Sequence, residues 1–176
     1  CPTCSKKIVV PRKIYDPGRV IGNDFVIEKV VGIGGMGTVF LARQISLDRP
    51  IALKVLLRRY SADSKFRQEF LREAQSVASM IHGNLVQVFA FGVDESDLYL
   101  AMEYVEGDTL GDRIEKNGKI DVSDALGIVQ QVTEGLHYAW EKDSLIHRDI
   151  KPDNIMITAD GWVKLTDMGL ARQQRD

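Results

Sequence analysis

Short hydrophobic segments separated by turn residues dominate the first half of the chain. Phe25–Val31, Thr38–Arg43 and Ile51–Leu57 are β-branched or alternating in character, a pattern that is typical of strands in an antiparallel meander. Two further runs of this kind, Leu85–Phe91 and Leu98–Glu103, follow later in the chain. The pattern therefore predicts a sheet of five antiparallel strands.

One helix is expected to interrupt this sheet. Between Ser64 and Met80, apolar residues recur at steps of three and four, which is the spacing of one buried helix face. The residues on this face are Phe66, Phe70, Ala74, Val77 and Ile81.

The second half of the chain begins with a helical pattern. Val122–Lys142 carries apolar residues at helical spacing, and two short strands, Ile155–Thr158 and Trp162–Leu165, are expected after it. Asp160–Gly161 supplies the Asp-Gly signal of a hairpin turn. A sheet followed by a helix-led part places the chain in the α+β class.

The composition divides the chain into three parts. Residues 1–23 contain several prolines and glycines with scattered basic residues, and we interpret them as an arm or linker. Residues 24–105 hold the expected sheet with its helix, and residues 106–176 hold the helix-led part.

The overall composition is that of a globular protein with a core of its own. Of 176 residues, 44% are hydrophobic and 27% are charged, which excludes the disordered and collagen-like classes. Lys and Arg number 23 against 25 Asp and Glu, so no basic field favours a nucleic-acid partner.

No apolar run approaches the roughly 18 to 20 residues that cross a bilayer, and the start resembles no signal peptide. We therefore expect a cytoplasmic piece. A membrane anchor downstream in the parent protein is compatible with this expectation.

The only two cysteines form one C-x-x-C pair. Cys1 and Cys4 have the spacing of half a zinc-ribbon knuckle,. Tetrahedral zinc needs four ligands, and the nearest histidine in sequence, His82, lies far away. Zinc is therefore expected in the arm only if a second half-site exists, and two inert thiols are the simpler interpretation.

A glycine-rich segment lies between the first two expected strands. Gly32, Gly34 and Gly37 form G-x-G-x-x-G, with Val39 two places later. Since it does not open a helix, the segment does not fit a dinucleotide-binding fold. It fits a hairpin lid in which backbone N–H groups approach phosphate oxygens, and a bent hairpin without a ligand is the alternative.

A lysine stands inside one of the apolar strands. Lys54 follows Ile51-Ala52-Leu53, and a buried ammonium group is tolerated only when it is paired. Glu69 and Glu73 lie one turn apart on the expected helix. Glu73 lies beside the apolar face, and we expect it to be the partner.

The most specific pattern lies near the end of the chain. His147–Asn154 reads H-R-D-I-K-P-D-N, and Asp167–Gly169 reads D-M-G after twelve intervening residues. The five fixed residues of the first motif would arise by chance in about one chain of this length in twenty thousand. Together with the glycine loop and the strand lysine, in that order, they resemble the protein kinase signature set. The resemblance covers residues 24–176, and Arg72–Gln75 and Met102–Val105 make it most similar to the bacterial serine/threonine type.

The resemblance implies a protein-kinase-like fold and a role for each matching position. Phosphates would lie under Gly32–Gly37, Lys54 would hold the α and β phosphates, and Glu73 would orient Lys54. Asp149 would accept the proton of the substrate hydroxyl, and Lys151 would steady the transferring phosphoryl group.

It also implies an adenine site and a metal site. The backbone at Glu103 and Val105 would bind adenine, with Met102 guarding the back of the pocket. The residues expected above and below the ring are Val39, Ala52 and Met156. Asn154 and Asp167 would hold magnesium ions, with manganese as an alternative. The implied partners are thus ATP and protein substrates with a serine or threonine hydroxyl, a preference that Lys151 indicates.

The sequence departs from the family pattern in three places. Met168 stands where phenylalanine is usual, and an apolar, adaptable side chain keeps the packing role. Gly83 replaces a proline that many relatives carry. The chain also stops at Asp176, before the later helices, so one face of the helix at Val122–Lys142 is expected to be partly bare, and this piece alone is expected to be inactive.

Three hypotheses follow for the parent protein. The first is an active ATP-dependent serine/threonine kinase, because competent residues fill every chemical position. The second is a nucleotide-binding pseudokinase or scaffold, which predicts missing catalytic groups. The third is a zinc-dependent interaction protein built on Cys1 and Cys4.

Overall fold

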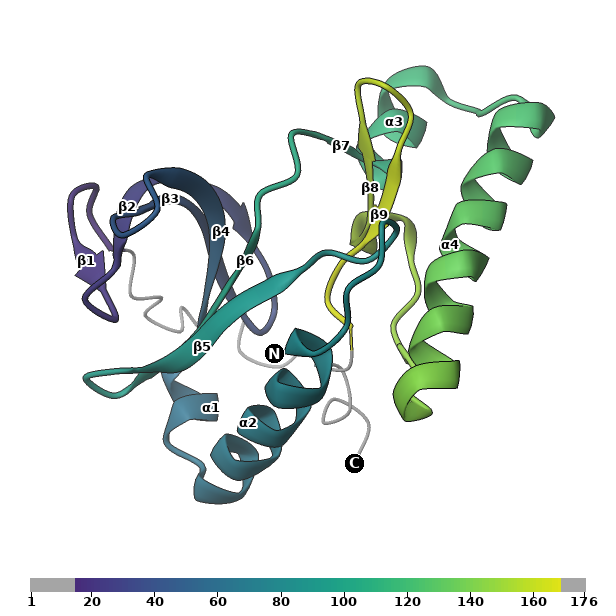
Figure 1. The fold of residues 1–176 in the computed structure, drawn as a ribbon. Helices are drawn as coiled ribbons and strands as arrows, with labels where there is room; N and C mark the ends of the chain where they lie inside the picture. The colour runs from purple at the N-terminus through teal and green to yellow at the C-terminus, as the bar shows by residue number, and fades with distance from the viewer. Residues whose placement is uncertain (1–14, 169–176) are drawn as a thin grey trace, which may run out of the picture.

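The computed structural model describes residues 15–168, and these form two parts joined by the segment after β6 (Figure 1). The first part is an antiparallel sheet with helix α2 (Ser64–Ala78) against it. The second part is a small sheet with helices α3 (Leu110–Asn117) and α4 (Val122–Asp143) beside it (Figure 1). Cys1, Cys4 and Gly169 lie outside the described residues.

A six-stranded antiparallel sheet forms the first part. Its spatial order is β1-β2-β3-β4-β6-β5. The strands are β1 (Val20–Ile21), β2 (Phe25–Ile33), β3 (Gly37–Gln44), β4 (Arg49–Leu56), β5 (Val88–Asp94) and β6 (Asp97–Glu103). The five expected strands are thus confirmed, and the two-residue β1 is added at the edge beside β2.

One of the expected strands begins later than the sequence pattern predicted. β5 starts at Val88, three residues after Leu85. The reason is that the residues before it bond to the second part of the molecule instead: Val86 N donates to Leu165 O at 3.0 Å, and Leu165 N donates to Asn84 O at 2.9 Å. This short segment therefore joins the two parts.

Residues from Tyr15 onward pack on the sheet, although the composition suggested an arm over residues 1–23. Tyr15 is only 4% exposed, its hydroxyl donates to Asp97, and its ring meets Phe40 edge to face at 6.0 Å. The guanidinium of Arg19 lies 4.6 Å from the centre of the Tyr15 ring. One aromatic anchor thus fixes the chain ahead of β1.

Helix α2 (Ser64–Ala78) covers one face of the sheet, as the periodicity predicted. Asp63 caps its start, because its side chain accepts hydrogen bonds from the N–H groups of Lys65 and Phe66,. The buried face consists of Phe66, Phe70, Ala74 and Val77. The prediction was wrong for Ile81, which is 76% exposed because the helix ends three residues earlier. A single turn, α1 (Arg58–Ser61), precedes α2.

The second part contains the expected helix and hairpin and two elements that the pattern did not predict. The helix is α4 (Val122–Asp143), and the hairpin strands are β8 (Ile155–Thr158) and β9 (Val163–Leu165). Gly161 in their turn has a φ of +86°, where glycine is favoured,. The added elements are β7 (Gly107–Thr109), which pairs with β8, and α3 (Leu110–Asn117). A 3₁₀ turn, η1 (Pro152–Asn154), precedes β8.

Helix α3 was not predicted from the hydrophobic pattern, because it buries none of its residues. Its signals are local: the Thr109 side chain accepts from Asp112 N, the Asp112 side chain accepts from Thr109 N, and Gly118 ends the helix with a φ of +77°. This capping box is visible in the sequence as Thr-x-x-Asp.

One hydrophobic core runs through both parts. It joins the inner face of α2 and the sheet to Val132 and Ala139 of α4, to the β8–β9 hairpin and to Met168, which is 4% exposed. The packing role expected for Met168 is therefore confirmed. A second cluster, around Tyr15 and Phe40, lies on the other side of the sheet. The two parts thus fold as one unit.

Helix α4 also keeps the exposed apolar face that the sequence analysis expected. Its side chains at Val122, Leu126, Val129 and Trp140 are all more than half exposed. The opposite face is close-packed, since a Cβ added to Gly135 would lie 3.2 Å from Asn84 O.

The third glycine of the loop is a steric requirement of the sheet. Gly37 pairs with Leu56 across β3 and β4, and a Cβ there would lie 2.3 Å from Val55 O. We predict that Gly37→Ala lowers the free energy of unfolding by about 1–3 kcal/mol, measured by urea denaturation. Gly32→Ala is the control, because its Cβ would meet no atom nearer than 3.9 Å. Equal stability of the two variants would contradict this account.

Candidate active site

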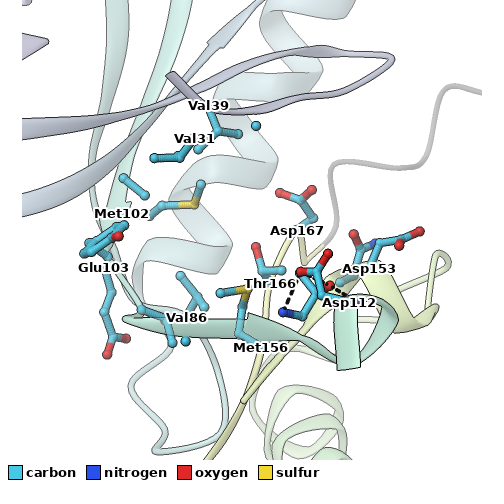
Figure 2. Close-up of a pocket in the computed structure, with 17 residues that line it drawn as sticks. Val31, Val39, Val86, Met102, Glu103, Asp112, Asp153, Met156, Thr166 and Asp167 are labelled. Carbon is cyan, nitrogen blue, oxygen red and sulfur yellow. Dashed lines mark hydrogen bonds between the residues drawn. The ribbon is translucent and has the colours of Figure 1, made fainter. Parts of the chain in front are cut away.

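A cavity of about 320 Å³ lies between the sheet and the β7–β9 region. Figure 2 shows Val31 and Val39 on one side of it and Met156, Thr166 and Asp167 on the other. The walls thus come from both parts of the molecule.

Most of the nucleotide contacts implied by the resemblance line this cavity. They are Gly32, Val39, Ala52, Met102, Glu103, Val105 and Met156, and the two implied metal ligands, Asn154 and Asp167, line it as well. Lys54, Gly34 and Gly37 are not among the lining residues. The two glycines close the hairpin turn, where Gly34 N donates to Gly37 O at 2.8 Å.

Lys54 connects the sheet to the second part by an ion pair. It lies in the middle of β4, opposite Val39 and Leu100 on the neighbouring strands, and it is 6% exposed. Its Nζ donates to Oδ1 of Asp167 at 2.7 Å. A buried ammonium group needs such a partner, so the sheet and the loop after β9 stabilise each other here.

The sequence pattern predicted a different partner for Lys54. Glu73 lies on α2, where it is half-buried. Its pairing with Lys54 stays a prediction. Periodicity alone could not predict whether Asp167 or Glu73 pairs with Lys54, because it does not show which carboxylate the fold places near the strand.

A second group of polar side chains surrounds Asp149. Lys151 Nζ donates to Asp149 Oδ2 at 2.8 Å, and Asn154 Nδ2 donates to the same oxygen at 3.1 Å. Asn154 Nδ2 also donates to the Asp149 main-chain oxygen at 2.8 Å. The carboxylate is therefore held from two sides, by a cation and by an amide.

These contacts set the charge of Asp149. The hydrogen bond from Lys151 lowers the pKa of Asp149, and burial opposes this by a smaller amount. The same bond raises the pKa of Lys151. At neutral pH, Asp149 is therefore an ionised hydrogen-bond acceptor beside a charged lysine.

His147 joins the loop that carries Asp149 to the loop that carries Asp167. It is 1% exposed; its Nδ1 accepts from Asp149 N at 3.2 Å, and its Nε2 lies 2.8 Å from Thr166 O. Because Nδ1 accepts, Nε2 must carry the hydrogen that is donated to Thr166. A further bond, from Thr166 N to Asn154 O at 2.9 Å, supports the same arrangement.

Arg148 has a left-handed backbone and an exposed side chain, with a φ of +66°. Asp167, with a φ of +62°, is the second such residue of the site. Non-glycine residues in this region are strained and cluster at functional sites; Asp167 lines the cavity, and Arg148 directly precedes Asp149 in the chain.

Sequence reasoning missed part of the cavity wall. The missed lining residues are Val31, Val86, Tyr104, Gly107, Thr109, Asp112, Asp153 and Thr166. Most of them are chain neighbours of residues that the motifs identified. Thr109 and Asp112 could have been found through their capping box.

The donor atoms at Asn154 and Asp167 suit a hard cation. An amide oxygen and a carboxylate are ligands that Mg²⁺ accepts, together with phosphate oxygens and water. Within residues 15–168, no group of three or more His, Cys, Asp or Glu side chains forms a separate metal site. The zinc half-site expected at Cys1 and Cys4 lies outside this range.

The hydropathy of the chain predicted no membrane-spanning segment. In the part of the chain that the structure describes, no helix combines the length and the apolar character needed to cross a bilayer.

Bacterial kinases are among the curated proteins of similar sequence. The serine/threonine-protein kinase PrkC of Bacillus subtilis (strain 168) is 42% identical over 154 residues, which make up 88% of this chain and 24% of PrkC. The serine/threonine-protein kinase PknB of Mycobacterium leprae (strain TN) is 38% identical over 160 residues, or 89% of this chain and 26% of PknB. The chain thus spans about a quarter of the length of these relatives.

The fold and the family agree with this similarity. The Mycobacterium tuberculosis PknI kinase domain superposes with a TM-score of 0.80 at 31% identity, covering 91% of this chain and 65% of that domain. The family described as protein kinase domain matches residues 25–176. The chain therefore belongs to the protein kinase family and resembles its bacterial serine/threonine members, as the sequence motifs predicted.

Proposed function

We propose that the protein transfers the γ-phosphoryl group of magnesium-bound ATP to serine or threonine hydroxyls of protein substrates. One observation carries the proposal: Lys54 Nζ from the sheet meets Asp167 Oδ1 from the other part at 2.7 Å, beside a cavity that Asn154 also lines. Phosphoryl transfer requires this convergence of charge on a triphosphate more than it requires a covalent nucleophile.

The cavity suits an adenine nucleotide. Its volume of about 320 Å³ lies at the lower end of the range for small-molecule sites. Val39 and Ala52 supply apolar surface from the sheet, and Met156 supplies it from β8. The backbone from Glu103 to Val105 crosses the same cavity, where its N–H and C=O groups would bind the adenine edge.

The phosphates would extend from adenine toward Lys54 and Asp167. Lys54 would bind the α and β phosphates, and the backbone of the glycine hairpin would cover them. Asn154 and Asp167 would hold magnesium, which neutralises charge on the phosphate oxygens. Replacing the direct Lys54–Asp167 contact by phosphate and metal would keep both side chains compensated.

Asp149 and Lys151 would serve the transfer step. Asp149, ionised at neutral pH because its pKa is lowered, would accept the hydrogen bond and then the proton of the substrate hydroxyl. Lys151, bonded to it at 2.8 Å, would steady the transferring group. The names of PrkC and PknB support a serine/threonine preference.

The proposal predicts separate effects for two substitutions in the full-length protein. Asp149→Asn should leave ATP binding close to normal and lower the rate of peptide phosphorylation by about 10²- to 10⁴-fold, because the general base is lost. Lys54→Met should weaken ATP binding as well. Calorimetric titration with Mg-ATP and a radiolabelled transfer assay measure the two effects. Normal ATP binding without any transfer by the wild-type protein would favour a nucleotide-binding scaffold instead.

The ion pair at Asp149 predicts a change in titration. Removing the hydrogen bond from Lys151 in Lys151→Met should raise the pKa of Asp149 toward its ordinary value, since that bond is the largest cause of the lowering. The protonated fraction at a given acidic pH therefore increases, and the acidic limb of kcat/KM moves to higher pH. ¹³C NMR of the Asp149 carboxyl group reports the shift directly. Lys116→Met, which removes a pair with Asp108, is the control and should leave the Asp149 titration unchanged; an unchanged Asp149 pKa in Lys151→Met would refute the assignment.

A further inference from the structure

The ion pair between Lys164 and Glu103 lies next to the nucleotide cavity and has no role in the proposed phosphoryl transfer. Lys164 Nζ of β9 lies 2.9 Å from each carboxylate oxygen of Glu103, the last residue of β6. The two side chains are only 18% and 29% exposed. In Figure 2 the Glu103 carboxylate points away from Val39 and Asp167, so the pair lies outside the space proposed for the phosphates.

On the sheet side, Glu103 is anchored through Gln87. Gln87 N donates to the Glu103 carboxylate at 3.2 Å, and Glu103 N donates to Gln87 O at 2.8 Å. The Gln87 side chain donates in turn to Ala78 O, at the end of α2, at 3.2 Å. One carboxylate thus receives a backbone N–H from the sheet side and the ammonium group of Lys164 from the other part.

On the β9 side, Lys164 is paired with a residue of the cavity floor, although it does not line the cavity itself. It is directly opposite Met156 in the β8–β9 pairing, and residues directly opposite each other in an antiparallel pair project from the same face. Met156 lines the cavity. Next to Lys164, Leu165 is hydrogen-bonded to Asn84 and Val86, so β9 is itself held against the sheet side.

We propose that Lys164 is a positioning residue for the adenine end of the nucleotide site. It fixes the backbone at Glu103 relative to the floor at Met156, so the gap that receives the ring is set before the ligand arrives. Because these groups are ordered before the ligand binds, binding does not have to offset the entropy of ordering them. The inference rests on the proposed function, because it assumes that adenine lies between these two residues.

The geometry restricts the effect to one end of the ligand. Within residues 15–168, Lys164 pairs with Glu103, whereas Lys54 pairs with Asp167. Losing Lys164 should therefore weaken contacts with adenine and leave contacts with phosphates unchanged. A residue that only stabilised the fold would not separate the two ends.

The test measures three probes on the full-length protein by calorimetry: adenosine, ATP with magnesium, and inorganic tripolyphosphate with magnesium. In Lys164→Met, affinity for adenosine and for ATP should fall by the same factor, about fivefold for a partly desolvated pair, while affinity for tripolyphosphate is unchanged. The KM for ATP should rise with kcat nearly constant. Lys164→Arg, which keeps the charge and the reach, should restore most of the loss.

Two further variants keep the result decisive. Glu103→Gln removes the charge from the other side and should give the same loss of adenosine affinity, and the double variant should lose no more than either single one, because the residues act as a pair. Lys116→Met, which breaks an exposed 2.9 Å pair with Asp108, should bind all three probes normally.

The contradicting outcomes are distinct. Normal adenosine affinity in both Lys164→Met and Glu103→Gln overturns this inference alone. An equal loss for adenosine and tripolyphosphate also overturns it, since that result indicates a general structural effect. A wild-type protein that binds neither adenosine nor ATP removes the proposed function and this inference together.

Discussion

The arrangement of the site depends on a lysine ammonium group that the sheet cannot solvate. Lys54 lies in the central strands at 6% exposure, and its partner, Asp167, comes from the far end of the described chain at 2.7 Å. Removing one partner of such a pair leaves an uncompensated charge. The ion pair therefore fixes the two parts of the molecule relative to each other. A cavity lies between them, and the cation and the carboxylate of the pair lie at its edge.

Other polar contacts also join the two parts of the molecule at the same boundary. His147 binds the loops of Asp149 and Asp167 together through its two ring nitrogens. Lys164 binds Glu103 across the back of the cavity. The backbone of Leu165 bonds to residues on both sides of Leu85. Polar groups that are fully satisfied in this way make a boundary rigid and specific, which is what a site built from two parts requires.

The sequence predicted the elements better than the contacts between them. Alternation and helical periodicity located the five main strands, α2 and α4, because each has a face that the core buries. Helix α3 buries none of its residues, and β1 is only two residues long, too short to show an alternating pattern, so both were missed. The motifs predicted Lys54, Asp149, Asn154 and Asp167 as site residues, since their spacing is rare by chance. No local pattern could reveal that Lys54 meets Asp167, or that Glu103 meets Lys164, because both pairs depend on how distant segments are folded together.

The central claim is that Lys54, Asn154 and Asp167 receive one metal-bound triphosphate. A crystal structure of the full-length protein with magnesium and a non-hydrolysable ATP analogue tests it most directly. The account predicts adenine between Val39 and Met156, phosphate oxygens within hydrogen-bond distance of Lys54 Nζ, and magnesium bound by Asn154 and Asp167. A nucleotide that occupies another site, or one whose phosphates lie away from a Lys54–Asp167 pair that remains closed, would contradict it.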